Sequence, residues 1–171
     1  MNKAVFCIAK SEEHAVRIVN QLKDAGFSNN DVSMLLPDRS GSRDLGHEQH
    51  TKAPEGAAAG AFAGGIAVGI LGWLVGIGSL AIPGVGPFIA AGPILAALGG
   101  AAAGGAVGGI TGALIGAGVP EYEAKQYEGK LKNGNILIAV HTEDSRERTA
   151  AKEIFERTKA DDISYTGEAR V

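Results

Sequence analysis

Residues 56–120 read GAAAGAFAGGIAVGILGWLVGIGSLAIPGVGPFIAAGPILAALGGAAAGGAVGGITGALIGAGVP, without a single Asp, Glu, Lys, Arg or His. Glu55 and Glu121 stand directly outside this glycine-rich block, which holds 20 of the 26 glycines in the 171-residue chain. The flanks on either side have the mixed charges and apolar periodicity of an ordinary soluble domain. The block therefore decides the fold, because it divides one small domain into two parts.

The first flank, residues 1–37, has the pattern of a strand, a helix and a second strand. Residues 4–9 form a continuous apolar run that is typical of a buried strand. Ser11 is a good N-cap, acidic residues follow in the first turn, and apolar residues recur at helical spacing as far as Gly26. Residues 32–36 then predict the second strand.

The second flank, residues 120–171, repeats this pattern after an additional helix that we expect to begin at Pro120. Residues 136–140 predict a strand, Asp144 opens the next helix with a capping box, and residues 163–166 predict the last strand. The second flank is therefore a second strand-helix-strand unit.

The two units have nearly the same spacing, with 23 residues from Ile8 to Asp31 and 24 from Ile138 to Asp162. Two such units in one small domain predict an α+β fold of the ferredoxin-like βαβ-βαβ kind, with one antiparallel sheet and its helices on one face. The second and third strands of that fold are neighbours. An insert between them must leave and return at nearly the same place.

This geometry predicts a helical hairpin for the block. The expected turn contains Pro83, Gly84, Gly86 and Pro87, and leaves roughly 27 residues on either side, enough to cross a bilayer as a helix. The hairpin either spans the bilayer fully or dips into one leaflet. The predicted organisation is a split ferredoxin-like domain (1–37 and 120–171), a polar linker (38–54) and the hairpin (55–119).

Glycines recur along both predicted helices at intervals that place them on one face. In water each would cost about 1 kcal/mol relative to alanine, but between packed helices small residues allow close approach. The predicted packing and oligomerisation residues are Gly60, Gly64, Gly65, Gly69, Gly72, Gly76, Gly100, Gly104, Gly108, Gly112 and Gly116. Two uses remain open: oligomerisation in a bilayer, or a lipid-free core of a filament, tube or shell.

The remaining composition favours no chemistry. A net charge of −3 and a pI near 5.8 speak against nucleic-acid binding. Cys7 reads as a core residue, and His47 and His50 lie in the polar linker without partners at metal-site spacing. We expect no enzyme activity, cofactor, metal or small-molecule substrate. The N-terminus lacks a signal-peptide pattern, so we expect a cytoplasmic domain with membrane association through the hairpin.

The chain resembles bacterial general stress proteins of the heat-induced or 17M type. The resemblance rests on residues 4–26, on the glycine-rich block, and on the passage GVPEYEAKQYE (118–128) that leads to GNILI (134–138). It implies a small cytoplasmic domain that carries a glycine-zipper hairpin and a role in stress. It implies no active site.

A second resemblance is to the small membrane-anchored subunit of bacterial quinol:electron-acceptor oxidoreductases, in which a membrane hairpin also interrupts an α/β domain. The block has one Trp and no His, so nothing in it indicates quinone or cofactor chemistry. Three hypotheses follow. The first is a membrane-associated homo-oligomer, the second a lipid-free self-assembling protein, and the third an accessory subunit of a redox complex.

Overall fold

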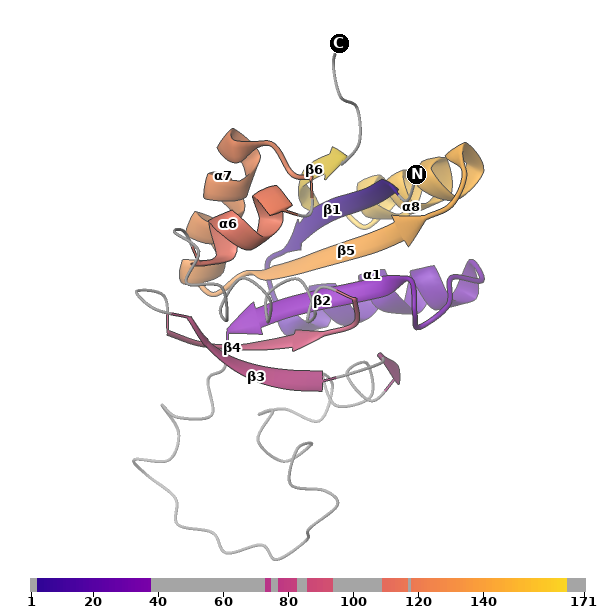
Figure 1. Ribbon diagram of the computed structural model, residues 1–171. Helices are drawn as coiled ribbons and strands as arrows, with labels where there is room; N and C mark the ends of the chain where they lie inside the picture. The colour runs from indigo at the N-terminus through magenta and orange to yellow at the C-terminus, as the bar shows by residue number, and fades with distance from the viewer. Residues whose placement is uncertain are drawn as a thin grey trace, which may run out of the picture.

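The computed structural model contains one mixed α/β unit built on a six-stranded sheet in the order β3-β4-β2-β5-β1-β6 (Figure 1). Every pair of neighbouring strands is antiparallel. The structure describes residues 3–37, 73–74, 77–82, 86–93, 109–116 and 118–165.

The first flank folds as its sequence predicts. Strand β1 (Lys3–Ala9) leads into helix α1 (Glu12–Asp24), and strand β2 (Val32–Pro37) follows. The Ser11 side chain accepts a hydrogen bond of 3.1 Å from the backbone N–H of His14, which confirms Ser11 as the N-cap.

The second flank begins with helix α7 (Glu121–Lys132), followed by β5 (Ile136–Thr142), α8 (Ser145–Arg157) and β6 (Asp161–Tyr165). The Asp144 carboxylate accepts hydrogen bonds of 2.8 Å from the N–H groups of Arg146 and Glu147. The Glu147 side chain in turn accepts one from the N–H of Glu143. The predicted start of α8 is therefore confirmed, and β6 begins two residues earlier than expected.

The two strand-helix-strand units interleave in the sheet. Strand β1 of the first unit lies between β5 and β6 of the second, and β5 lies between β1 and β2 of the first. Cys7 is opposite Ile138, and Leu35 is opposite Leu137. Strand β2 therefore ends beside the start of β5, and the long segment that joins them leaves and rejoins the sheet at the same end.

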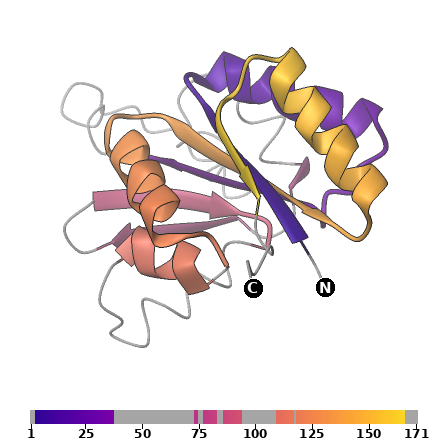
Figure 2. The same ribbon diagram turned by 90° about the horizontal axis from the view of Figure 1, so that it is seen from above.

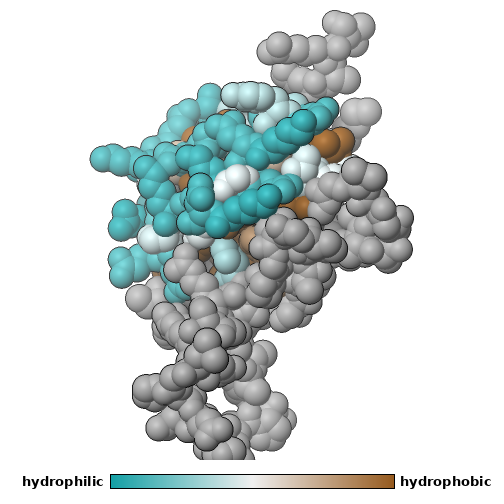
Figure 3. Space-filling view, turned by 90° about the vertical axis from the view of Figure 1, so that its left-hand side faces the viewer, coloured by the Kyte–Doolittle hydropathy of each residue, from teal (hydrophilic) through white to brown (hydrophobic). Residues whose placement is uncertain are grey.

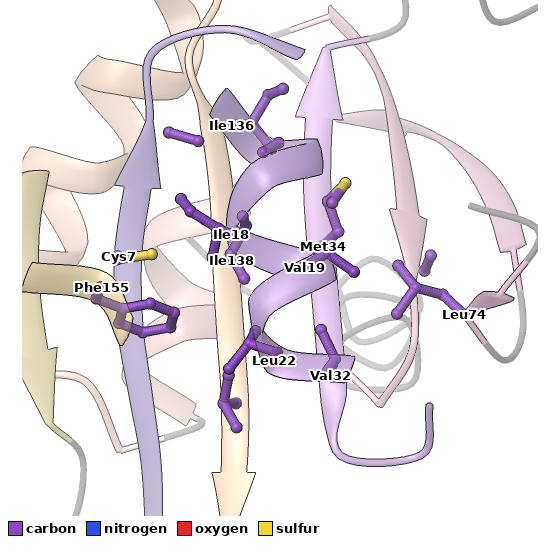
Figure 4. Close-up of a cluster of buried hydrophobic side chains, with 14 of the residues drawn as sticks. Cys7, Ile18, Val19, Leu22, Val32, Met34, Leu74, Ile136, Ile138 and Phe155 are labelled. Atoms are coloured by element: carbon purple, nitrogen blue, oxygen red, sulfur yellow. The ribbon is translucent and has the colours of Figure 1, made fainter. Parts of the chain in front are cut away.

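Helices cover both faces of the sheet: the helices of the two strand-helix-strand units share one face as predicted, but the prediction did not include the helices on the other face. Helices α1 and α8 pack on one face, and α6 (Gly109–Gly116) and α7 lie on the other (Figure 2). The physical reason lies in the strands themselves: β1 and β5 are apolar at successive positions, so each presents hydrophobic side chains to both sides. Figure 4 shows part of the core under α1, with Ile18 and Leu22 facing β5 and β2.

The centre of the glycine-rich block is a pair of strands, which overturns the predicted helix at these residues. Strand β3 (Ile77–Ile82) pairs with β4 (Gly86–Ala91), and β4 pairs with β2. The chain therefore reverses between strands here. Of the predicted turn residues, Gly86 and Pro87 lie in β4, while Pro83 and Gly84 lie outside the described residues. A two-sided buried strand has no polar alternation, so its sequence pattern does not distinguish it from an apolar helix.

The boundary predicted at residues 119 and 120 crosses a packed region. Ile110 and Leu114 of α6 and the following Val119 are buried in the same cluster as Tyr127 and Leu131 of α7. Residues 109–119 therefore belong to the α/β unit as far as the structure describes them. The rest of the predicted hairpin (55–72 and 94–108) and the whole predicted linker (38–54) lie outside the described residues.

Candidate functional site

The glycine-rich block is attached to the α/β unit at three places, and the first is the dipeptide Trp73-Leu74. Leu74 is buried in the cluster under α1, beside Val32 and Met34 (Figure 4). Trp73 packs against the same cluster, and the ammonium group of Lys23 lies 5.2 Å from the centre of its ring. These contacts fix the end of residues 56–72 against the first helix.

The second attachment is strand β4, whose side chains enter the core on both faces. Phe88 and Ala90 join the cluster under α6 and α7, while Ile89 and Ala91 join the cluster under α1 and α8. Burying a residue the size of Phe or Ile contributes about 1.5 to 3 kcal/mol. Strand β4, in the centre of the block, is therefore part of the folding core.

The third attachment is helix α6, which α7 holds through Glu128. The Glu128 carboxylate accepts hydrogen bonds from the hydroxyl and from the backbone N–H of Thr111, near the start of α6, and pairs with Lys132 at 3.0 Å. An anion at this position satisfies a free N–H of the first helical turn. Partial burial alone would raise the pKa of Glu128, but the hydrogen bonds from Thr111 and Lys132 outweigh it, and the net pKa is lowered.

Gly92 is a structural residue of the block that the sequence reasoning missed. Its φ is +83°, and a Cβ atom there would lie 2.2 Å from the carbonyl oxygen of Val32. Only glycine fits so close to the backbone of β2. The signal was present in the sequence, since Gly92-Pro93 is a dipeptide typical of a turn.

The structure describes two of the eleven predicted packing glycines, Gly112 and Gly116, and both lie in α6. Gly116 is exposed, and no atom lies within 4 Å of the position that its Cβ would occupy. Within the described residues Gly116 makes no close contact with another helix. The other nine predicted packing glycines lie outside the described residues.

Few large apolar side chains are exposed in the described part of the chain. They are Ile115 in α6 and Tyr122 in α7, at 43% and 79% exposure, together with Tyr165 in β6. Ile115 and Tyr122 lie on either side of the sharp connection between the two helices. The side of the molecule that carries α7 is otherwise mostly hydrophilic (Figure 3).

Tyr127 is a buried polar residue that joins two elements of the fold. Its hydroxyl lies 2.5 Å from the carbonyl oxygen of Asp162, to which it donates, and 2.6 Å from the hydroxyl of Ser164. Burial raises the pKa of Tyr127 well above its ordinary value. A neutral, fully hydrogen-bonded phenol at this position joins α7 to the edge strand β6, and its role is structural.

His14 and Cys7 are also held in structural roles. Nδ1 of His14 accepts from the N–H of Lys10, so the neutral ring carries its proton on Nε2 and donates to the carbonyl oxygen of Thr158 at 2.7 Å. Cys7 is fully buried, and burial raises the pKa of its thiol. Within the described residues no three His, Cys, Asp or Glu side chains gather in a group that could hold a metal. His47 and His50 lie outside them.

None of the helices in the described ranges is long and apolar enough to cross a bilayer. Comparisons with protein families, with curated proteins and with solved structures found no match for the chain.

Proposed function

We propose that this is a non-enzymatic protein that associates with itself and with a membrane surface through its glycine-rich block. One observation carries the proposal: an uncharged block of 65 residues is fastened to the α/β unit at Trp73-Leu74, at β3-β4 and at α6. Two uncharged arms adjoin these attachments: residues 56–72 precede Trp73-Leu74, and residues 94–108 join β4 to α6. An uncharged apolar segment of this length stays in solution without aggregating only if protein or lipid covers its surface.

The lengths of the arms favour contact with one leaflet of a bilayer over a full crossing. The first arm has 17 residues and the second has 15. As continuous helices they would reach only about 26 Å and 22 Å, whereas a bilayer core is about 30 Å thick. Because the attachments belong to one rigid sheet, both arms start from the same side of the membrane, with the α/β unit on the cytoplasmic side.

The glycine spacing supports self-association of the arms. Gly100, Gly104 and Gly108 follow one another at intervals of four in the second arm, and Gly60 and Gly64 do so in the first. Such spacing on a helix leaves a smooth face on which a second helix packs closely. The interleaved order of β2, β5, β1 and β6 supports a ferredoxin-like domain as the carrier of this surface.

The resemblance to bacterial general stress proteins supports a role in the stress response for such an assembly. Under this proposal the α/β unit presents the arms and needs no cofactor, metal or substrate.

The short second arm also favours a second candidate, in which the arms of several copies form a lipid-free core. Residues 94–108 are mostly Ala and Gly, so their transfer into lipid gains little free energy, while their small side chains suit tight protein packing. Both candidates require contacts between copies through the glycine face.

Replacing Gly104 and Gly108 by Leu tests the self-association, because bulky side chains would separate the packed helices. We expect the oligomer measured by sedimentation velocity to fall in mass by about twofold or more. Gly129→Leu is the control, since Gly129 is exposed on α7 with open space around its Cβ position. An unchanged mass for the Gly104→Leu/Gly108→Leu variant would overturn the proposal.

A further inference from the structure

The two edges of the sheet differ in how well they are protected against pairing with another strand. Strand β6 forms one edge and β3 forms the other. Open edges in natural proteins are normally protected by charges, bulges or prolines, because their free N–H and C=O groups recruit further strands. Comparing the two edges shows which one is built for contact.

The β6 edge carries the usual protection. Its short strand contains Asp161 and Asp162, its pairing with β1 shifts register between Phe6 and Ile8, and Asp162 has a positive φ of 49°. Lys10 and Lys130 pair with these aspartates. Charge and irregular backbone together make this edge a poor template for a further strand.

The β3 edge carries none of these features. Its sequence, IGSLAI, has no charged residue and no proline, and it pairs with β4 without a register shift from Ile77↔Ala91 to Ile82↔Gly86. Among the described strands β3 has a partner on one side only. It is a regular, neutral strand, and no other strand in the described residues pairs with its outer row of backbone groups.

Pro87 determines which residues of β3 form that row. Proline has no N–H, so Ala81↔Pro87 must be a pair without direct backbone hydrogen bonds. Because such pairs alternate with hydrogen-bonded ones, Gly78, Leu80 and Ile82 bond to β4. The backbone groups of Ile77, Ser79 and Ala81 therefore face outward from the sheet.

We propose that β3 pairs with β3 of a second copy of this chain, antiparallel, with Ser79 opposite Ser79 across a two-fold axis. In this register Ile77 pairs with the second copy's Ala81, so each of three directly opposed pairs makes two backbone hydrogen bonds. The contact joins two six-stranded sheets into one. The inference rests on the self-association proposed above and names one of its contact surfaces.

The occupant is a second copy because the edge is complementary to itself. Ile77 and Ala81 lie at equal spacing on either side of Ser79, so a two-fold axis through Ser79 places the larger Ile77 opposite the smaller Ala81 of the other copy, and two neutral strands meet without repulsion. A charged partner would gain nothing from this edge, since β3 offers no ion pair.

Cross-linking at Ser79 tests the pairing in the full-length protein. In the Ser79→Cys variant two thiols face each other across the axis, with Cα atoms about 5.5 Å apart, so a short bismaleimide joins them. Cys7 does not compete because it is fully buried. We expect a covalent dimer for Ser79→Cys and none for Tyr165→Cys on the opposite edge. Equal cross-linking at both positions, or none at Ser79, would overturn the inference.

Charged substitutions at Ser79 give a second test, and a folding defect cannot explain its result because mixing the two variants should restore the contact. Ser79→Lys alone and Ser79→Glu alone each place like charges on the axis, and we expect each to lose about half of its mass in sedimentation velocity. An equimolar mixture of the two variants should regain the mass, because the introduced ammonium group of one copy then faces the introduced carboxylate of the other. Failure to regain it would contradict the pairing.

The strand contact at β3 and the glycine contact between the arms can be refuted separately. Loss of the Ser79 cross-link with a normal response to Gly104→Leu/Gly108→Leu would refute only the strand contact. A retained cross-link with no response to the glycine substitutions would refute only the glycine contact.

Discussion

At the scale of single residues, two glycines with nearly the same backbone angle lie in opposite surroundings. Gly26 ends α1 with φ +91° and has no atom within 4 Å of its Cβ position. Gly92 ends β4 with φ +83°, and its Cβ would overlap the backbone of Val32 and Ser33. The contrast separates the cost of a left-handed backbone from the cost of a clash.

Gly92→Ala should therefore destabilise the fold more than Gly26→Ala. The left-handed conformation costs about 1 to 2 kcal/mol for alanine at either site. At Gly92 the overlap with the backbone adds to this, since β2 and β4 would have to separate. Urea unfolding of both variants measures the difference, and equal losses would show that residues 86–92 do not pack on β2.

Tyr127→Phe should cost about 1 to 2 kcal/mol of unfolding free energy, because the hydroxyl bonds to Asp162 and Ser164 are lost in the core. Tyr122→Phe is the matched control: Tyr122 lies on the same helix but is 79% exposed. Thermal unfolding of the two variants gives the comparison. A loss of the same size for Tyr122→Phe would contradict the structural role of the buried phenol.

The raised pKa of Tyr127 also sets the sign of a pH effect. The folded state holds the phenol proton more tightly than the unfolded state, so this contribution to stability is complete below about pH 10 and is lost as the pH rises above it. The stability of Tyr127→Phe should fall less steeply in this range. Equal slopes for the two proteins in alkaline urea titrations would refute the linkage.

At the scale of elements, α6 is held to the unit by packing and by one carboxylate. Ile110 and Leu114 are buried against α7, and Glu128 accepts both hydrogen bonds from Thr111. Helix α6 has eight residues and is rich in glycine, so it is too short and too weak a helix to be stable without these contacts. Glu128 therefore controls how firmly the second arm is attached.

Glu128→Gln should loosen α6 by roughly 1 kcal/mol, seen as faster hydrogen exchange at the amides of residues 110–114. The lowered pKa of Glu128 gives the pH dependence: the stabilisation is present above the unfolded pKa near 4.3 and is lost as the pH falls below it. Glu121→Gln is the control, since its pair with Lys125 is exposed. If lowering the pH still speeds hydrogen exchange in α6 of the Glu128→Gln variant, a group other than Glu128 causes the pH dependence.

The sequence predicted the flanking elements because their signals are local. Ser11 and Asp144 lie at caps, and apolar residues in α1 and α8 recur at helical spacing. The addition of β3 and β4 to the sheet depends on contacts of Phe88 and Ile89 with distant strands, and no local pattern encodes it. In the candidate site, the spacing of the glycines can be read from the sequence. The close approach of Gly92 to the backbone of Val32 can be recognised only when the position of β2 is known.

At the scale of the whole molecule, one rigid α/β unit holds a long uncharged block at three points. The attachments shorten the free apolar segments from the expected roughly 27 residues to two arms that are too short for a crossing helix of about 20 residues. Within the described residues, polar groups such as Tyr127 and Glu128 join helices and strands of this unit.

Flotation of the full-length protein with phosphatidylcholine and phosphatidylglycerol vesicles tests the central claim most directly. The account predicts that the protein rises with the vesicles, because the arms gain apolar burial in one leaflet. A protein that stays at the bottom of the gradient as an oligomer would contradict membrane association and support a lipid-free core.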